Sequence, residues 1–507
     1  MIRIVKVGFL TLPLLLAGTA LAQPVAQVIA IPGTTFTPVQ TELFNKPNTY
    51  SNAWADFDKD GWLDLAVSSQ SGEIRLFRNV HGKFVSVGAE MGLPTIGKES
   101  RGLSWGDYDG DGWPDLYSGS ADPKGVSSLF HNLDGKKFVN VAPEMGVEFP
   151  GRSSRQSNFI DYDNDGKVDL YATDRIGKNK LFHNEGGKFV QVMTDGAVTV
   201  FSSTVGACWF DYNKDGLLDL FLGNQSGKAD ALLRNNGDGT FTDVAPALHM
   251  DLPSRTAEEG GVGCAIGDYD ADGNLDIFVP NYGRNVLWHS NGDGTFTNTA
   301  EEMGVAVENH AVGASWGDYD NDGFPDLFIS SYTGPRGEQQ PHDALFHNQG
   351  GKGFVNVITT DSALNRSDHG AEWVDYDNDG ALDLSITRGY TAAGGQFLFH
   401  NNLPKAAAAH SLAVMVLDAK GHYTQAGAEV RVYDQHGKIL GAAEVSSGGG
   451  YGVQDIIPVH FGLPNQTKVT VEVTFMSNTG RKVHRVPNVT LSSYYGKSLV
   501  VRRPAGI

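Results

Sequence analysis

The stretch "DYDNDGFPDLFIS", Asp318 to Ser330, places four aspartates within nine residues and then becomes apolar. Ca²⁺ takes about six to eight oxygen ligands, and aspartates at positions one, three, five and nine of a loop would supply several of them. Gly323 at position six permits the sharp turn, and position seven offers a carbonyl. An EF-hand would need glutamate at position twelve, where Ile329 stands, and the apolar residues after Asp326 favour a strand. The stretch therefore predicts a calcium loop between two strands.

The same loop occurs seven times, and successive loops start 50 to 57 residues apart. A recurrence of this size indicates a repeat architecture. Of the 28 acidic ligand positions, 27 are aspartate, and the exception is Asn213 in the fourth loop. We expect up to seven Ca²⁺ ions, one for each repeat, with the residue at position seven contributing its carbonyl. The predicted metal ligands are Asp56, Asp58, Asp60, Trp62, Asp64, Asp107, Asp109, Asp111, Trp113, Asp115, Asp161, Asp163, Asp165, Lys167, Asp169, Asp211, Asn213, Asp215, Leu217, Asp219, Asp268, Asp270, Asp272, Asn274, Asp276, Asp318, Asp320, Asp322, Phe324, Asp326, Asp375, Asp377, Asp379, Ala381 and Asp383.

Each repeat also contains the segments of a four-stranded unit. A strand such as "AVGASWG" enters the loop, "LFIS" leaves it, "LFHN" forms a third strand, and "KFVNV" a fourth. Four strands per repeat are typical of a propeller blade. The seventh repeat stops after its third strand, whereas "GTTFTPV" at residues 33–39 stands alone before the first loop. We predict an all-β fold, a seven-bladed β-propeller over residues 23–404, closed by residues 33–39 as the fourth strand of blade seven.

The two ends of the chain differ from the repeats. Residues 1–22 carry Arg3 and Lys6, then an apolar stretch and a small-residue site before Gln23, which predicts a signal peptide and an exported, periplasmic or extracellular protein. No later segment has the roughly 18 apolar residues of a membrane span. Residues 405–507 lack the loops and alternate in polarity, which predicts a small antiparallel β domain. This domain would cap the propeller, or would recognise a ligand through "SSGGGYG".

The loops and the tail resemble known families. The repeated D-x-D-x-D-G-x-x-D loops resemble FG-GAP or VCBS repeats, which form the seven-bladed propeller of integrin α chains. Residues 427–464, "GAEVRVYDQHGKILGAAEVSSGGGYGVQDIIPVHFGLP", resemble the ASPIC/UnbV domain. Together they resemble the cartilage acidic protein family and its bacterial relatives. The chain departs from this pattern at "FMSNTG", residues 475–480, where the domain usually carries a Trp-Pro-like segment.

Two kinds of side chain recur through the repeats. A large residue stands two positions before each loop, and this stripe predicts core packing between blades at Trp54, Trp105, Phe159, Trp209, Ile266, Trp316 and Trp373. Histidine occurs in the third strand of five repeats, at His131, His183, His289, His347 and His400. Metal ligands must converge within a few ångströms, and these histidines belong to different blades. We therefore expect no metal site shared among them.

Charged residues also gather where the inner strands begin. If all inner strands run the same way, these residues meet at the channel mouth opposite the calcium loops, where they would form either a hydrated rim or a ligand site. They are Glu99, Arg101, Arg152, Arg155, Glu258, Glu259, His310, Arg366, Asp368 and His369.

The only two cysteines, Cys208 and Cys264, lie in the inner strands of blades four and five. Export and an even cysteine count favour a disulfide between them. Cysteine is also often buried as a small apolar residue, so the sequence leaves both states open.

Composition restricts the function. The formal net charge is −20, and seven Ca²⁺ ions would return +14, leaving about −6. No basic run argues for nucleic acid binding. The main hypothesis is a non-catalytic, calcium-binding interaction or adhesion scaffold whose partner is an extracellular protein or glycan. The alternative is an enzyme, a lyase or hydrolase acting on extracellular polysaccharide at the channel mouth, although the sequence shows no nucleophile motif.

Overall fold

The computed structural model describes residues 29–150, 153–193, 196–332, 342–365, 369–389 and 394–506. Blade six shows the repeating unit, in which four strands pair antiparallel in chain order. They are β25 (Ala311–Gly317), β26 (Asp326–Ser331), β27 (Ala344–Asn348) and β28 (Phe354–Asn356). The loop "DYDNDGFPD" joins β25 to β26. Because β25 and β26 are covered on both faces, nearly all of their residues are buried, whereas two of the three residues in the outer strand β28 are exposed.

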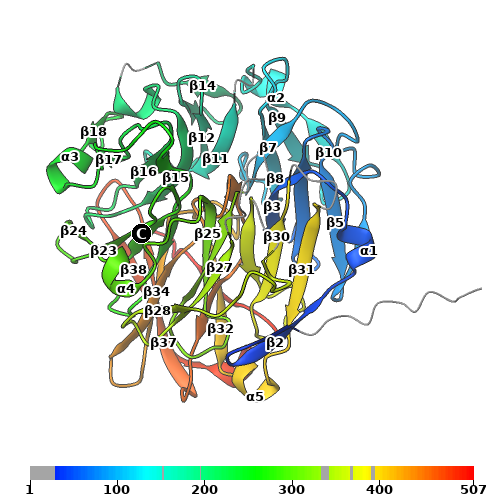
Figure 1. Ribbon diagram of the computed structural model, residues 1–507. Helices are drawn as coiled ribbons and strands as arrows, with labels where there is room; N and C mark the ends of the chain where they lie inside the picture. Colours follow the sequence, from blue (N-terminus) through cyan, green and yellow to red (C-terminus); the bar gives the residue numbers. More distant parts are fainter. Residues whose placement is uncertain are drawn as a thin grey trace, which may run out of the picture.

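Strand pairing gives seven sheets of this kind, arranged around a centre (Figure 1). The all-β propeller fold predicted from the sequence is therefore confirmed. The strands of the other sheets are β3 (Thr49–Ala55), β4 (Asp64–Ser69), β5 (Arg75–Val80), β6 (Lys83–Ser86); β7 (Ser100–Gly106), β8 (Asp115–Ser120), β9 (Ser128–Asn132), β10 (Phe138–Asn140); β11 (Ser154–Ile160), β12 (Asp169–Asp174), β13 (Lys180–Asn184), β14 (Phe189–Gln191); β15 (Thr204–Phe210), β16 (Asp219–Asn224), β17 (Ala231–Asn235), β18 (Phe241–Asp243); β20 (Ala265–Gly267), β21 (Asp276–Val279), β23 (Val286–Ser290), β24 (Phe296–Asn298); and β29 (Ala371–Val374), β30 (Asp383–Thr387), β31 (Gln396–Asn401).

Short elements occur between and beside the blades. The strands β19 (Gly260–Gly261) and β22 (Asn281–Tyr282) pair beside blade five. Each α-helix is a single turn, and the two 3₁₀ turns are shorter still. These elements are α1 (Thr41–Phe44), α2 (Ala142–Met145), α3 (Ala245–Leu248), α4 (Ala300–Met303), α5 (Lys405–Ala408), η1 (Ala197–Thr199) and η2 (Leu491–Ser493).

The N-terminal segment closes the ring. The strand β2 (Thr34–Pro38) pairs antiparallel with β31 and becomes the fourth strand of blade seven, as the sequence predicts. The strand β1 (Ile29–Ile31) then pairs with β2. Phe36 in β2 is completely buried. Its ring contacts Tyr319 of blade six and Trp373 of blade seven, so the closing strand also contributes to the core between these blades.

Two devices join neighbouring blades. In six blades the third strand carries a buried asparagine whose amide donates to the position-two carbonyl of the preceding blade's loop, at 2.7 to 2.9 Å. In blade five Ser290 occupies this place, and its short side chain makes no such bridge among the described residues. Cys208 and Cys264 form a disulfide between blades four and five, with 6.2 Å between their Cα atoms. The disulfide thus lies at the interface that lacks the asparagine bridge.

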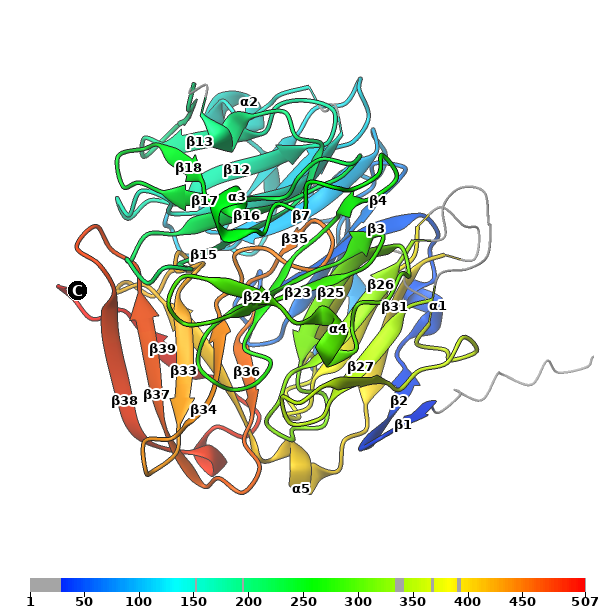
Figure 2. The same cartoon turned by 60° about the vertical axis from the view of Figure 1, so that its left-hand side comes forward.

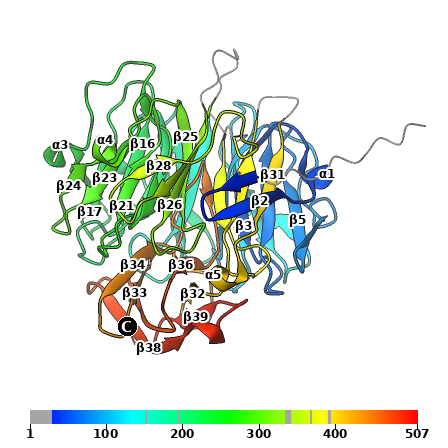
Figure 3. The same cartoon turned by 60° about the horizontal axis from the view of Figure 1, so that its bottom comes forward.

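The C-terminal domain consists of two further sheets that lie against one face of the propeller (Figures 2 and 3). One contains β36 (Val459–Gly462), β32 (Ser411–Leu417) and β39 (Leu499–Arg502), and the other contains β34 (Ile439–Glu444), β33 (Glu429–Tyr433), β37 (Lys468–Phe475) and β38 (Lys482–Thr490). Their facing valines and Phe475 form a separate core. The expectation of a purely antiparallel domain is wrong, because β32 and β39 pair in parallel.

A loop of the C-terminal domain enters the propeller. This segment, residues 445–457, is called the plug here, and its strand β35 (Val453–Gln454) pairs in parallel with the inner strand β7 (Figure 2). Ser447 exchanges hydrogen bonds with the backbone of Trp209 in blade four, and the backbone of Ile456 donates to Trp54 in blade one. The segment "SSGGGYG" is therefore packed inside the propeller, where its Tyr451 lies at the channel mouth beside Arg101.

The predicted stripe of large side chains lies in the core. Trp54, Trp105 and Trp209 are fully buried, and each belongs to a hydrophobic cluster that joins two adjacent blades. The predicted core role of the stripe is confirmed. The predicted signal peptide, residues 1–22, lies outside the described residues. Within the described part of the chain, no helix has the length and apolarity needed to cross a membrane.

Candidate metal sites and channel mouth

The loop of blade six shows how the sequence folds at each candidate metal site. Asp318 at position one accepts hydrogen bonds from the amides of Asp322 (3.0 Å) and Gly323 (2.8 Å). Gly323 has a φ of 101°, a left-handed conformation that glycine adopts without strain. Asp326 at position nine accepts from the amide of Tyr319 at 3.1 Å and from the third strand. The carboxylates are thus held in place by backbone donors before any ion binds.

The other loops repeat this geometry. In all seven, the position-five carboxylate accepts from the amide of position seven, and the position-nine carboxylate accepts from the third strand. Position-six glycines all have φ between 86° and 101°. The structure therefore brings the predicted residues of each loop together, seven times, at the same end of the inner strands.

The electrostatics of the loops suit the binding of a cation. Burial and the neighbouring aspartates raise the pKa of Asp161 to about 7 and that of Asp169 to about 9. Asp107 is completely buried, and neither of its carboxylate oxygens has a hydrogen-bond partner, although the amides of Gly110 and Gly112 face it. A buried carboxylate without a partner is costly. A divalent cation would provide the partner, and oxygen-rich donors are those that Ca²⁺ prefers.

The sequence reasoning missed where the third-strand histidines point. Each of the five lies beside the aspartate loop of its own blade. His131 Nδ1 lies 3.1 Å from Asp115 Oδ1 and 3.4 Å from Asp109 Oδ2. A potential ligand atom of His131 lies within 4.8 Å of those of Asp109 and Asp111. The equivalent loop-facing histidines are His183, His289, His347 and His400.

Two blades replace this histidine with arginine. In blade one, Arg78 Nε lies 2.7 Å from Asp58 Oδ2, so a fixed positive charge already faces the loop. In blade four the residue is Arg234, and a second guanidinium arrives from the C-terminal domain, where Arg481 Nη1 lies 3.7 Å from Asp211 Oδ2. Asn213 also belongs to this loop. The blade four loop, with one carboxylate fewer and the added guanidinium of Arg481, is therefore the least negative of the seven.

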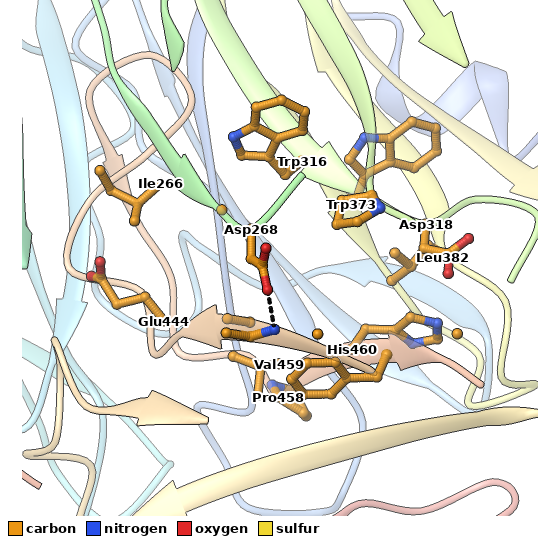
Figure 4. A pocket seen from close by; sticks show the side chains of 18 of the residues that line it. Ile266, Asp268, Trp316, Asp318, Trp373, Leu382, Glu444, Pro458, Val459 and His460 are labelled. Carbon is orange, nitrogen blue, oxygen red and sulfur yellow. Dashed lines mark hydrogen bonds between the residues drawn. The ribbon is translucent and has the colours of Figure 1, made fainter. Parts of the chain in front are cut away.

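The C-terminal domain touches the loop face directly. The amide of Ala442 donates to Asp268 Oδ2 at 2.9 Å, and a cavity of about 170 Å³ lies beside this contact (Figure 4). Trp316 and Trp373 line it from the propeller, and Glu444 and His460 line it from the domain (Figure 4). Burial raises the pKa of Glu444 well above its usual range and lowers that of His460 to about 4. The His460 side chain is therefore uncharged at neutral pH.

The opposite channel mouth is built around the tip of the plug. Tyr451 Oη accepts a hydrogen bond from Arg101 Nη1 at 3.2 Å, and its ring lies 5.0 Å from that of His369. Arg155 lies at the matching end of the next inner strand, β11. The structure thus gathers Arg101, Arg155 and His369 as predicted, with His310 near the same rim.

Glu99 also lies at the mouth, where it pairs with Arg101. The remaining predicted mouth residues divide into two groups. Glu258 is exposed on a turn, and Glu259 is part of the same turn and accepts from the amide of Thr256. Arg152, Arg366 and Asp368 lie outside the described residues.

Family comparisons agree with the site geometry. The FG-GAP-like repeat model matches residues 56–118, 161–222, 211–279 and 268–329, and the ASPIC and UnbV model matches residues 419–495. The chain contains FG-GAP-like repeats and an ASPIC/UnbV domain. The FG-GAP matches include the aspartate loops of blades one to six, and the ASPIC/UnbV match includes the plug.

Relatives of this FG-GAP and ASPIC/UnbV protein include Cartilage acidic protein 1. The mouse (Mus musculus) protein is 28% identical over 205 residues, which are 38% of this chain and 30% of the relative. The Xenopus tropicalis protein is 28% identical over 250 residues, which are 46% of this chain and 34% of the relative. The match therefore spans about a third of these relatives.

Solved structures give a more distant likeness. Saccharomyces cerevisiae Sqt1 has a TM-score of 0.43 at 10% identity, covering 73% of this chain and 94% of that chain. An Agrocybe aegerita lectin specific for non-reducing terminal N-acetylglucosamine has a TM-score of 0.40 at 16% identity, covering 63% and 82%. At these scores the likeness says nothing about ligand or function.

Proposed function

We propose that this protein is an exported, calcium-binding β-propeller that acts as a non-catalytic interaction or adhesion scaffold. The observation that carries the proposal is the sevenfold convergence of buried carboxylates, including the unpartnered Asp107, at one end of the inner strands. The residues of each loop would hold one Ca²⁺ ion through positions one, three, five and nine and the carbonyl of position seven. The disulfide and the FG-GAP repeats support an extracellular setting.

The ASPIC/UnbV domain would complete the scaffold. It covers the loop face, and its plug bonds to inner strands of blades one to four, including Trp54, Leu103, Phe159 and Trp209. Calcium in the loops would therefore stabilise both the propeller and the surface that the C-terminal domain contacts. The propeller and its cap would then present a rigid outer surface and mouth to an extracellular protein or glycan.

The proposal is tested by measuring calcium binding and partner capture in one preparation. Calorimetry should give up to seven calcium ions per chain, and chelation should lower the melting temperature. Arrays of extracellular proteins and glycans should then retain the calcium-loaded protein and lose it in EDTA. A chain that binds no calcium, or whose array binding is the same in EDTA, contradicts the proposal.

A further inference from the structure

Buried positive charge at the channel mouth is only partly balanced. Arg101 is 5% exposed and pairs with Glu99 at 2.5 Å. Arg155 is 7% exposed, and its guanidinium makes one hydrogen bond, to the carbonyl of Ser154 at 3.0 Å, with no ion pair among the described residues. Taking an unpaired cation out of water costs free energy unless an anion accompanies it. Arg155 is therefore a buried cation without a counter-ion among the described residues, and an anionic ligand would balance its charge.

The surroundings of Arg155 restrict what that anion belongs to. Tyr451 is buried beside Arg101, and its hydroxyl accepts a hydrogen bond from Arg101. Aromatic rings form one side of the rim, where Tyr282 lies 3.8 Å from His310 and is nearly parallel to Tyr332 at 6.4 Å, between ring centroids. These three rim residues are partly exposed. Ligand sites commonly combine aromatic surfaces with a few charged groups that fix orientation.

We infer that this mouth cluster, Arg101, Arg155, Tyr282, His310, Tyr332 and Tyr451, binds the anionic group of an acidic saccharide. A guanidinium presents two parallel N–H donors, which match the oxygens of a carboxylate or a sulfate ester. The aromatic rim offers flat faces to the sugar ring beside it. The inference rests on the proposed scaffold function for its extracellular partner, and it assigns that partner a chemical class.

The mouth cluster is independent of the metal loops in space. The inner strand β7 begins beside Arg101 and ends at the blade two loop, and its seven residues span roughly 20 Å at about 3.3 Å each. Anion binding at the mouth therefore needs no direct calcium bridge. A saccharide bound through calcium would instead sit at the other face, which the C-terminal domain covers.

The test is calorimetric titration of the full calcium-loaded chain with four probes: an oligogalacturonate, a sulfated galactan oligomer, a neutral galactan oligomer and sodium sulfate. We expect one or both acidic oligomers to bind, more weakly as salt is raised, and the neutral oligomer not to bind. The tighter acidic oligomer identifies the anion as carboxylate or sulfate. Equal binding of neutral and acidic oligomers, no binding of either, or sulfate binding as tightly as the oligomers would overturn the inference.

Variants assign the binding to the cluster. Arg155→Met should weaken acidic oligomer binding at least about tenfold. Arg155→Lys should keep part of the affinity, because lysine retains the positive charge but lacks the paired N–H donors of the guanidinium. Arg284→Met is the matched control, because Arg284 is exposed at the edge of blade five and pairs with Glu301. If Arg155→Met melts early, Tyr282→Leu on the rim provides the second test. Wild-type affinity in both Arg155→Met and Tyr282→Leu would contradict the inference.

The result is separable from the test of the scaffold. Acidic oligomers that fail to bind a protein with normal calcium stoichiometry reject the mouth site alone. Loss of calcium binding with retained oligomer affinity rejects the calcium-dependent scaffold and leaves the mouth site standing.

Discussion

Single side chains decide how strongly each loop attracts a cation. Asn213 removes one carboxylate from the blade four loop, and Arg481 brings a guanidinium to 3.7 Å from Asp211. Both changes weaken attraction for Ca²⁺. We expect this loop to lose calcium first as calcium is withdrawn, and Asn213→Asp to tighten its binding. Calorimetric calcium titration checks this, with Asn164→Asp at position four of the blade three loop as a control of equal charge. An identical effect of both variants would contradict it.

The loop aspartates also predict how pH and calcium act together. In the metal-free native state the pKa of Asp161 is raised to about 7 and that of Asp169 to about 9, above their unfolded value of 3.8. The native state then holds protons that the unfolded chain has released, so metal-free stability falls as pH rises through these values. Calcium requires ionised carboxylates and replaces the protons. We therefore expect calcium to stabilise the protein more at alkaline pH than at acidic pH.

The measurement is thermal unfolding in calcium and in EDTA at about pH 5.5 and about pH 8, within the range where these carboxyl groups titrate. The melting temperature in EDTA should fall between the two values, and the gain from calcium should grow. A site at a hundredfold excess over its dissociation constant contributes about 2.7 kcal/mol. Equal calcium gains at both pH values would contradict the assignment of the loops as metal sites.

At the scale of elements, the plug depends on the absence of side chains. Gly448 has a φ of 138°. A Cβ there would lie 2.3 Å from the side-chain amide nitrogens of Gln156 and Asn158 and 2.8 Å from the backbone carbonyl oxygen of Ala207. Gly449 has nothing within 4 Å of a Cβ. We expect Gly448→Ala to destabilise the protein by about 1–3 kcal/mol through overpacking, and Gly449→Ala to have little effect. Denaturant unfolding compares them, and equal stabilities would show that the plug does not fill the channel in solution.

Elements differ in how far the sequence reveals them. The closing strand could be predicted because "GTTFTPV" matches the fourth-strand pattern of the other repeats. The plug could not, because β35 is two residues long and its glycine-rich flanks read as a turn; the channel that receives it exists only once the blades have assembled. The position of the loop-facing histidines could have been predicted from the strand register. Phe130 pairs with Leu116 in an antiparallel ladder, so the next residue, His131, must lie opposite Asp115 of the loop. Continuing the strand register into the loop would have found them.

At the scale of the whole molecule, the ring is held by pairing between its ends. Removing residues up to 39 would delete β1 and β2 and expose the edge of β31, and exposed edges invite aggregation. We expect that truncation to melt earlier and to associate in size-exclusion chromatography. A chain starting at Gly33 keeps β2 and is the control. A monomeric truncation with an unchanged melting temperature would contradict closure by this strand.

The interface between blades four and five offers a second whole-molecule prediction. A native disulfide typically contributes about 2–4 kcal/mol. We expect the double variant Cys208→Ser, Cys264→Ser to lower the melting temperature, and the added change Ser290→Asn to recover part of the loss by restoring the bridge to the loop of blade four. Thr297→Asn, at an exposed position of the neighbouring outer strand β24, is the control. Equal recovery by both changes would show that the asparagine bridge is not the cause.

The placement of that disulfide has a consequence for the lifetime of the fold. A closed ring has no free end from which to unfold, so the rate at which it opens is set by its weakest interface between blades. Six of these interfaces contain an asparagine hydrogen bond, which reduction does not affect. The seventh contains the disulfide instead. In an oxidising compartment the circle is complete. Under reducing conditions the interface between blades four and five has neither the disulfide nor an asparagine bridge. The lifetime of the closed ring then depends on the redox state of its surroundings.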